Sequence, residues 1–361
     1  MLKRNKKLLL LGTSLILIHI LVLGAFFFAP YDPAEQHRDN PFAPPTRLHF
    51  VDSEGKLHLR PYVCSWANHA NGIGAPQYVE DCSRISTLRF LVRDERSHSL
   101  RGLGMAWRLF GADGPAPMYL LGTDDYGRDQ LSRLLYGGRI SLFAGLLATG
   151  LSLALGLLMG GVAGYFGSWP DDIIMRGAEV FMALPWIYLL FAVRAFLPLD
   201  VGARQSFFIL IGVIGVTGWA RPSRLIRGVI LSAKERDFVH AARGFGASHS
   251  YILRRHLLPQ TSAVILTQAA FLIPQFILAE VTLSFLGLGV GEPVPSWGNM
   301  LASLQKYYVL ESYWWMFLSG IILIPIFLLY NAVANALSAR LERADAEVRS
   351  SMGTQKLQVA S

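Results

Sequence analysis

The chain has 361 residues, of which 52% are hydrophobic and 16% are charged, whereas soluble domains carry about 25% charged residues. This composition argues against an ordinary soluble enzyme and indicates an integral membrane protein. The sequence holds 33 Lys and Arg against 25 Asp and Glu, and only two Cys, which argues against a Cys-rich metal framework or a disulfide-dense scaffold.

The first candidate membrane span runs from Leu8 to Phe28, 21 residues without a formal charge. At about 1.5 Å per residue, this helix crosses a hydrocarbon core of about 30 Å. A secretory signal is the alternative, but its apolar region is usually about 7 to 15 residues long, so we expect a retained helix. Four basic residues precede it and place the N-terminus in the cytoplasm by the positive-inside rule: Lys3, Arg4, Lys6 and Lys7.

Five further apolar runs bring the predicted number of spans to six: residues 140–165, 173–197, 205–220, 260–279 and 312–339. An even number of spans returns the C-terminus to the cytoplasm. The sequence therefore predicts an all-α polytopic membrane protein. Its predicted parts are residues 1–29 (cytoplasmic N-terminus and first span), 30–138 (external insertion), 139–339 (membrane core) and 340–361 (cytoplasmic tail).

The external segment begins with a Pro-rich linker at 30–45. Residues 47–51 and 56–60 flank a turn signal at 52–55, which predicts a β-hairpin. We therefore expect a small β-containing insertion between the first two spans. Cys64 and Cys82 both lie in it, and in an oxidising compartment we expect a disulfide between them; the alternative is two unpaired thiols.

The end of this insertion, Thr123 to Asp129, is rich in Asp. It lacks the spacing and the distal Glu of a calcium loop. We expect Thr123 to be the N-cap of an amphipathic surface helix, because Asp residues favour the first turn and the next three Leu share one face: Leu131, Leu134 and Leu135.

Gly156, Gly160 and Gly164 are spaced four residues apart in the second span, which predicts close packing against another helix. We find no internal repeat that would supply a second half, so one chain is not expected to complete a transport pathway alone.

Sequence motifs for catalysis are missing. There is no Walker A sequence, since Gly55-Lys56 is followed by Leu, and there is neither a zincin nor a nucleophile-elbow motif. We therefore predict no catalytic residues, cofactor or metal. Two alternatives stay open at this point: a stand-alone secondary transporter or channel, and a membrane enzyme with an external active site, although its His spacings match no compact zinc pattern.

The predicted cytoplasmic loop, residues 221–259, holds eight basic residues against Glu235 and Asp237, as the positive-inside rule requires. Four residues in it have helical spacing and predict a narrow apolar face: Phe238, Ala241, Ala242 and Phe245. Gly246 is expected to interrupt this helix, which resumes at 251–257 and stops at Pro259. Such a helix suits a groove on another protein; a solvated basic loop near anionic lipid is the alternative.

A polar stripe marks the fifth span, where Gln268, Gln275 and Thr282 recur every seven residues. Polar side chains within a membrane are costly unless they face water or a neighbouring helix. The stripe therefore predicts either a pathway lining or hydrogen bonds between helices.

The cytoplasmic loop also resembles a known family. His240-Ala241-Ala242, Gly246 and Leu258-Pro259 are similar to the EAA loop of importer-type ABC permeases, with His240 in place of Glu and His256 in place of Ile. Four further blocks resemble the dipeptide/oligopeptide/nickel permeases: residues 121–129, 138–142, 279–289 and 295–298. The resemblance covers residues 1–30 and 118–345, and the family usually has a shorter link between the first two spans.

This resemblance implies a type I importer subunit, a non-catalytic half-channel of the C-type in the bacterial inner membrane, that carries dipeptides or oligopeptides. Its implied partners are a second homologous permease, two cytoplasmic ATPase subunits, an external solute-binding protein and membrane lipid, but no nucleic acid. The residues implied in ATPase coupling are Glu235, Phe238, His240, Ala241, Ala242, Gly246, Leu258 and Pro259. A nickel chelate or another small solute is not distinguished from peptide by the sequence.

Overall fold

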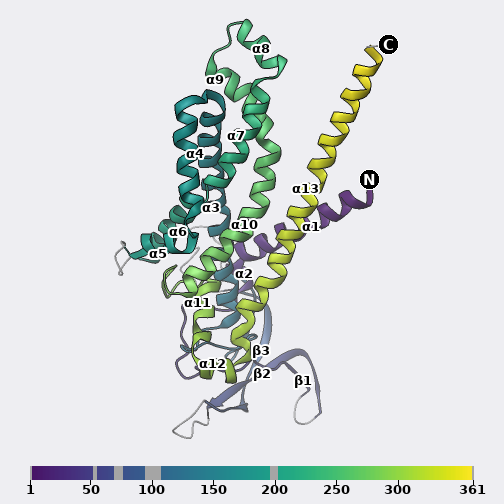
Figure 1. The fold of residues 1–361 in the computed structure, drawn as a ribbon. Helices are drawn as coiled ribbons and strands as arrows, with labels where there is room; N and C mark the ends of the chain where they lie inside the picture. The colour runs from purple at the N-terminus through teal and green to yellow at the C-terminus, as the bar shows by residue number, and fades with distance from the viewer. Residues whose placement is uncertain (1, 52–54, 69–75, 94–106, 196–201, 360–361) are drawn as a thin grey trace.

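The computed structural model describes residues 2–51, 55–68, 76–93, 107–195 and 202–359. The chain is a bundle of long helices with a small β-sheet at one end, and α8 and α9 lie at the opposite end (Figure 1). The C-terminus lies at the level of α8, and the N-terminus lies nearer the middle of the bundle (Figure 1). The sheet and α8 therefore mark two opposite ends of the molecule.

The helices follow one another along the chain as α1 (Leu2–Leu23), α2 (Ala25–Phe28), α3 (Gln130–Phe166), α4 (Ser168–Ala183), α5 (Trp186–Ala195), α6 (Ala203–Thr217), α7 (Ala220–Lys234), α8 (Asp237–Gly244), α9 (His249–Tyr251), α10 (Ser262–Phe285), α11 (Trp297–Ala302), α12 (Tyr307–Ser312) and α13 (Leu318–Val359). Short 3₁₀ turns at 303–305 and 314–317 connect the last three.

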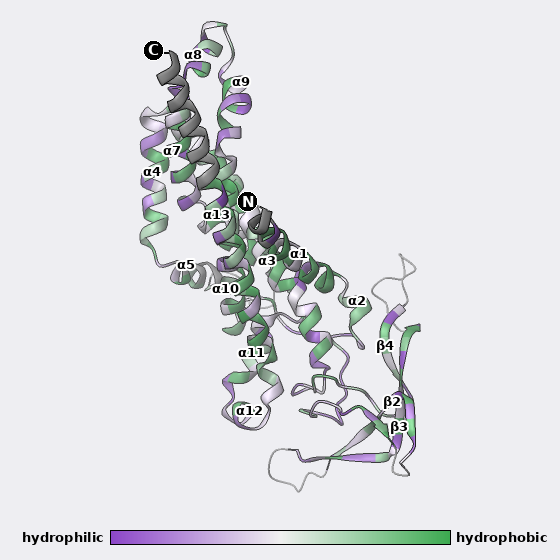
Figure 2. Cartoon of the chain, turned by 90° about the vertical axis from the view of Figure 1, so that its right-hand side faces the viewer, coloured by the Kyte–Doolittle hydropathy of each residue, from purple (hydrophilic) through white to green (hydrophobic). Residues whose placement is uncertain are grey.

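Three helical stretches in the described part of the chain are long and apolar enough to cross a membrane: Gln130–Phe166, His249–Phe285 and Trp314–Leu341. A fourth is reached if α6 and α7, bent by 44°, form one span; the apolar part of α1, Leu8–Leu23, is shorter. Figure 2 shows α10 and α1 largely hydrophobic. The count of six spans stays a prediction.

The predicted N-cap at Thr123 is wrong. α3 starts at Gln130, and Asp129 is its N-cap, with its carboxylate accepting a hydrogen bond from the Ser132 amide at 2.7 Å. The Thr123 hydroxyl is already used in the linker, where it accepts from the Ala43 amide and donates to the Asn40 carbonyl. α3 runs unbroken to Phe166, so there is no separate surface helix before the span.

The predicted helix stop at Pro259 is also wrong. Helical structure continues from His249 to Phe285, through a π-helical segment (Ile252–Leu257) and a 3₁₀ turn (Leu258–Thr261) into α10. The wide π turn just before Pro259 accommodates the ring and the missing N–H without ending the helix.

Two other predicted spans are broken. The expected span 173–197 is divided between α4 and α5 at Leu184 and Pro185, and residues 196–201 lie outside the described part of the chain. The helix of the expected span 205–220 breaks after Thr217, and α7 continues at an angle to Lys234. Residues 221–234, predicted as loop, are therefore helical.

The glycine stripe of α3 packs on α7, as its spacing predicted. A β-carbon on Gly160 would collide with the Ser223 carbonyl oxygen, and one on Gly156 would lie 2.8 Å from Pro222 Cβ. Glycine is the residue that permits two helix backbones to approach this closely. This contact fixes α7 to α3.

Two apolar clusters form the core between the long helices. The first joins α3, α6 and α10 through Ala144, Ala148, Leu210, Ile211, Ile214, Leu272, Phe276, Ala279 and Leu283. The second joins α1, α3, α10, α11 and α13 through Val22, Leu142, Ile277, Val281, Trp297, Met300, Leu323, Ile326 and Tyr330. α3 and α10 contribute to both clusters and are therefore the central helices of the bundle.

The sheet is antiparallel, with strand order β1 (His49–Val51), β2 (Leu57–Asn68), β3 (Tyr78–Arg93) and β4 (Trp107–Asp113). β1 and β2 form the hairpin expected from the turn signal, with Val51 opposite Leu57; residues 52–54 of that turn lie outside the described part of the chain. One face of the sheet packs on the polypeptide before α3, where Val63 and Leu88 contact Ala116 and Met118.

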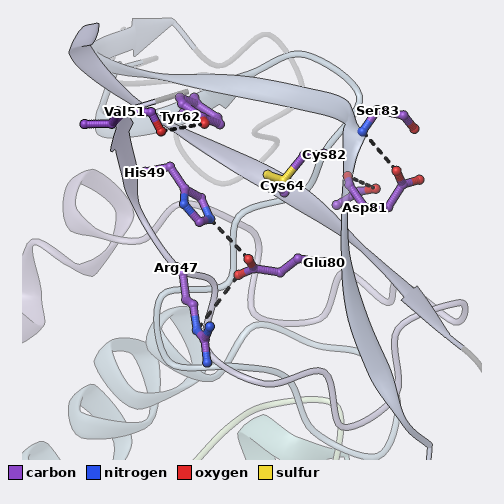
Figure 3. The surroundings of a disulfide bond; sticks show 10 residues. Arg47, His49, Val51, Tyr62, Cys64, Glu80, Asp81, Cys82 and Ser83 are labelled. Atoms are coloured by element: carbon purple, nitrogen blue, oxygen red, sulfur yellow. Dashed lines mark hydrogen bonds and ion pairs between the residues drawn. A yellow bond between two sulfur atoms is a disulfide. The ribbon is translucent and has the colours of Figure 1, made fainter. Parts of the chain in front are cut away.

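A disulfide joins Cys64 of β2 to Cys82 of β3, and the Cα atoms lie 4.6 Å apart (Figure 3). Nearby, Glu80 lies between Arg47 and His49, with a His49 Nε2 to Glu80 Oε2 distance of 3.3 Å (Figure 3). The disulfide therefore links β2 to β3, close to the contacts of Glu80 with Arg47 and His49.

Candidate functional site

α8 projects from the end of the bundle between α7 and α9 (Figure 1). Its C-terminus is a Schellman motif: the Gly246 amide donates to the Arg243 carbonyl, and the Ala247 amide donates to the Ala242 carbonyl. Gly246 has φ +76°, a conformation that glycine adopts without strain. The predicted interruption of the helix at Gly246 is therefore present, and its backbone turns the chain toward α9.

α8 is held by a buried cluster, which we call the α8 core. Val239 has no exposed surface, and Ala242, half-buried, packs beside it. The other buried members come from α3, α7 and the π-helical segment: Tyr165, Ile226, Ile230, Ala233, Ile252 and Leu257. Leu258 is half-buried against the same cluster, whereas Pro259 is exposed.

The predicted apolar face of α8 is divided by the structure. Only Ala242 points inward, whereas Ala241 is exposed, the Phe238 side chain is partly exposed and Phe245 is 93% exposed. The residue that holds α8, Val239, was not identified from the sequence. Its spacing of three from Ala242 was the available signal. The outward residues leave an apolar surface on a helix at the tip of the molecule.

The polar residues around α8 are also exposed. His240 Nε2 lies 3.9 Å from Glu235 Oε2, with both side chains more than half exposed, so this pair contributes little to stability. Deeper in, the Tyr165 hydroxyl lies 2.7 Å from His249 Nδ1, and the Arg243 guanidinium lies over the Tyr165 ring at 5.9 Å. These contacts join α8 and α9 to the end of α3.

The polar stripe of α10 is mixed in character. Gln268 is half-buried and Gln275 is exposed. The Thr282 hydroxyl donates to the Leu278 carbonyl in its own helix at 2.8 Å, so its proton is satisfied without a neighbouring helix. Gln275 is the member of the stripe that lines a cavity.

That cavity has a volume of about 520 Å³ and lies where two helices break. Its walls are the α4–α5 break, the α6–α7 break and one side of α10: Phe181, Met182, Ala183, Leu184, Pro185, Ile214, Thr217, Gly218, Ala220, Arg221, Leu272, Gln275, Phe276 and Ala279. Arg221, which the sequence placed in the cytoplasmic loop, is in the first turn of α7 beside this cavity.

An ionic network lies at the other end of α3, near the sheet; Asp124, Arg128 and Arg133 are buried in it, and Glu292 is 46% exposed. The Arg128 guanidinium contacts Asp124 at 2.7 Å and Glu292 at 2.6 Å. Arg133, only 1% exposed, contacts Glu292 at 2.9 Å and Asp124 at 3.4 Å. Although burial raises the pKa of Glu292, the Arg133 and Arg128 guanidinium groups hold it below its usual value. The sequence did not predict this network, because Glu292 lies 164 residues after Arg128.

Within the described residues, no group of three or more His, Cys, Asp or Glu side chains lies close enough to hold a metal ion. The exposed face of α8 and the cavity beside α10 are the candidate functional features.

The apolar helices define an integral membrane protein, and comparison with known proteins gives its family. The chain belongs to the family of binding-protein-dependent transport system inner membrane components, whose profile matches residues 153–343. It is thus an integral protein of the inner membrane.

Several curated relatives are peptide permeases. The chain is 38% identical over 201 residues to the dipeptide transport system permease protein DppC of Bacillus subtilis, covering 56% of this chain and 61% of that protein. It is 34% identical to the oligopeptide transport system permease protein OppC of B. subtilis, covering 65% and 75%. It is also 34% identical to the glutathione transport system permease protein GsiD of Pectobacterium atrosepticum, covering 64% and 74%.

Among solved structures, an inward-facing MetNI methionine ABC transporter gives a TM-score of 0.44 at 16% identity, covering 58% of this chain and 95% of that chain.

Proposed function

We propose that this chain is the permease subunit of an ATP-driven ABC importer for dipeptides or oligopeptides. It would form half of the translocation pathway and hydrolyse no ATP itself. The observation that carries the proposal is the exposed apolar face of α8, formed by Phe238, Ala241 and Phe245 and supported from beneath by the α8 core. A helix presented in this way fits a groove on a cytoplasmic ATPase subunit.

The proposed topology has six spans, with both termini and α8 in the cytoplasm and the sheet outside. The basic residues before the first span and around α8 support this orientation. So does the disulfide, because such bonds persist in oxidising compartments. The end of α13 at the level of α8 agrees with a cytoplasmic C-terminus (Figure 1).

The proposed partners are a second homologous permease, two ATPase subunits, an external solute-binding protein and membrane lipid. The Gln268, Gln275 and Thr282 side of α10 would line the pathway shared with the second permease. The relatives described above are permeases of dipeptide, oligopeptide and glutathione transport systems, which supports a peptide substrate.

Coupling would proceed by rigid-body motion. α8 is fixed to α7 through the α8 core, and α7 is fixed to α3 through Gly156, Gly160 and Gly164. A close-packed contact without room for adjustment transmits displacement. Movement of the ATPases would therefore shift α7 and α3 together and switch the bundle between two packings.

The proposal is tested by replacing Phe245 with Ala and purifying the permease with its ATPases. Loss of this exposed aromatic should weaken ATPase association about tenfold or more, because interface aromatics often dominate binding. The matched control is Trp169→Ala, which removes an aromatic that is 70% exposed on α4, and it should leave the association unchanged. Equal ATPase recovery with Phe245→Ala and wild type would contradict the docking role.

The sheet lies on the proposed external side, and we propose that it helps dock the solute-binding protein. A passive stabilising insertion is the alternative, since long insertions are tolerated at little cost. The Thr46 amide donates to the Tyr119 carbonyl at 2.8 Å, so residues 47–118 can be replaced by a short Gly/Ser joint. Weaker binding-protein affinity with unchanged basal ATPase activity is the expected result; unchanged affinity and uptake would show a passive insertion.

A further inference from the structure

The cavity beside α10 combines a broken helix pair with an unusual charge. α6 and α7 meet at a 44° bend, and together they qualify as one membrane span. Arg221 lies just after this bend, in the first turn of α7. Discontinuous helices within a membrane commonly surround substrate sites in transporters, because the broken segment offers polar groups that a continuous helix does not.

The cavity walls are mainly apolar. Among the described residues that line the cavity, Arg221 is the one with a formal charge, and no Asp or Glu is among them. Gln275 and Thr217 add an amide and a hydroxyl; the Thr217 hydroxyl donates to the Ile214 carbonyl at 3.0 Å and keeps its lone pairs. Arg221 is itself exposed, and a guanidinium with no carboxylate among the other lining residues is available to form charge-assisted hydrogen bonds with an anionic occupant.

A second basic residue of α7 shows the contrast. Arg227, two turns further along, forms an ion pair with Asp171 of α4. That arginine joins two helices of the bundle. No Asp or Glu is among the residues that line the cavity beside Arg221. An ion pair between helices, which accounts for Arg227, therefore does not account for Arg221.

We propose that Arg221 binds the terminal α-carboxylate of the transported peptide, and that Gln275, which lines the same cavity, contacts the adjacent peptide bond. This inference rests on the proposed importer function and names a specificity-determining residue within it. A guanidinium binds a carboxylate through two parallel charge-assisted hydrogen bonds. The volume of about 520 Å³ falls in the range of about 300 to 1,000 Å³ that holds small ligands.

The test uses the complete importer, reconstituted with its binding protein and ATPases, and two probes: dialanine and dialanine amide. Wild type, Arg221→Gln, Arg221→Lys and Arg224→Gln are compared. Arg224 is exposed on the same helix, as Arg221 is, but it does not line the cavity, so it is the matched control. We expect Arg221→Gln to lower dialanine uptake about tenfold, as expected for loss of a charged hydrogen bond, without changing amide uptake.

Arg221→Lys keeps the charge but loses the paired hydrogen bonds, so it should reduce dialanine uptake less than Arg221→Gln does, whereas Arg224→Gln should match wild type. Undiminished dialanine uptake by Arg221→Gln would overturn the inference. Equal loss in the Gln and Lys variants would also overturn it, because that result indicates packing rather than charge. A wild-type importer that takes up neither probe would instead contradict the proposed peptide import itself.

Discussion

The two ends of this molecule are built in different ways. At the α8 end, the contacts that hold the helix come mostly from residues 226–258, and apolar side chains are left exposed. At the sheet end, the buried Arg128 and Arg133 pair with the partly exposed Glu292, which is 164 and 159 residues away, and a disulfide joins the neighbouring strands β2 and β3. One end leaves an apolar surface exposed, whereas the other is cross-linked internally.

This difference fits their proposed roles. A helix that must follow an ATPase needs an exposed contact surface and a small, well-packed support. An external region that must keep its shape benefits from cross-links and from partners that leave no buried charge unpaired. Substitutions at the α8 end, at the sheet end and in the contact between α3 and α7 test this contrast. The pH dependence of stability tests the sheet end separately.

The largest expected effect is at the α8 end. Ala242→Trp would not fit in the α8 core, and Gly246→Trp would place a side chain at φ +76°, a strained conformation for L-residues. Both should abolish transport and loosen ATPase co-purification while membrane insertion stays intact. Gly228 is an exposed glycine of α7 with open space around it. Gly228→Trp should therefore retain both transport and ATPase co-purification. Normal uptake by the Ala242 and Gly246 variants would remove the basis for the coupling role.

The next effect is at the sheet end. Asp124→Asn would leave Arg128 and Arg133 buried with less negative charge around them, which should lower the free energy of unfolding by about 3 to 5 kcal/mol. Asp113→Asn is the matched control, since Asp113 pairs with Arg89 at the surface, where both side chains are more than half exposed, and it should cost less than about 1 kcal/mol. Thermal unfolding in detergent measures both, and similar losses would show that the network is not a buried unit.

Removal of the disulfide should have a smaller and more local effect. Cys64→Ser with Cys82→Ser should destabilise the sheet by about 3 kcal/mol and leave the helix content by circular dichroism unchanged. Mass spectrometry of non-reduced, alkylated peptides from the native protein should recover the two Cys as a linked pair. Recovery of both thiols with the alkylating label would contradict the bond.

The contact that joins the two ends can be weakened at a single glycine. Gly160→Ala would force the Ser223 backbone of α7 away from α3, with a cost of about 1 to 3 kcal/mol. Gly150→Ala, on the same helix with open space around it, should instead be neutral or slightly stabilising, because Ala favours helix. A Gly160 variant as stable and active as the Gly150 variant would indicate a looser contact than the structure has.

The smallest effect is a pH dependence at the sheet end. Burial raises the pKa of Asp129 to about 7, against the Ser132 hydrogen bonds that lower it. Because the folded-state pKa is above the unfolded value, this group's stabilisation is present below about pH 4 and is lost as the pH rises through about 7. Wild type should therefore lose a few °C in Tm between pH 6 and 8. The Tm of Asp129→Asn should fall less over the same pH range. Identical profiles of Tm against pH for wild type and Asp129→Asn would contradict the raised pKa of Asp129.

The sequence by itself determined the features that repeat locally. Uninterrupted apolar runs located α3, α10 and α13; the spacing of four identified the glycines of α3 as a packing surface; and the turn signal predicted the β1–β2 hairpin. Each of these depends on helix or strand periodicity, so neighbouring residues carry the whole signal.

Only the tertiary structure decided which side of α8 faces inward, where α3 begins, and whether helical structure continues past Pro259. It also placed Arg221 beside a cavity and joined Arg133 to Glu292, which are 159 residues apart. Periodicity gives no information about partners at such separations. Burial and charge pairing depend on which distant segments meet, and that is set by the packing of the whole bundle.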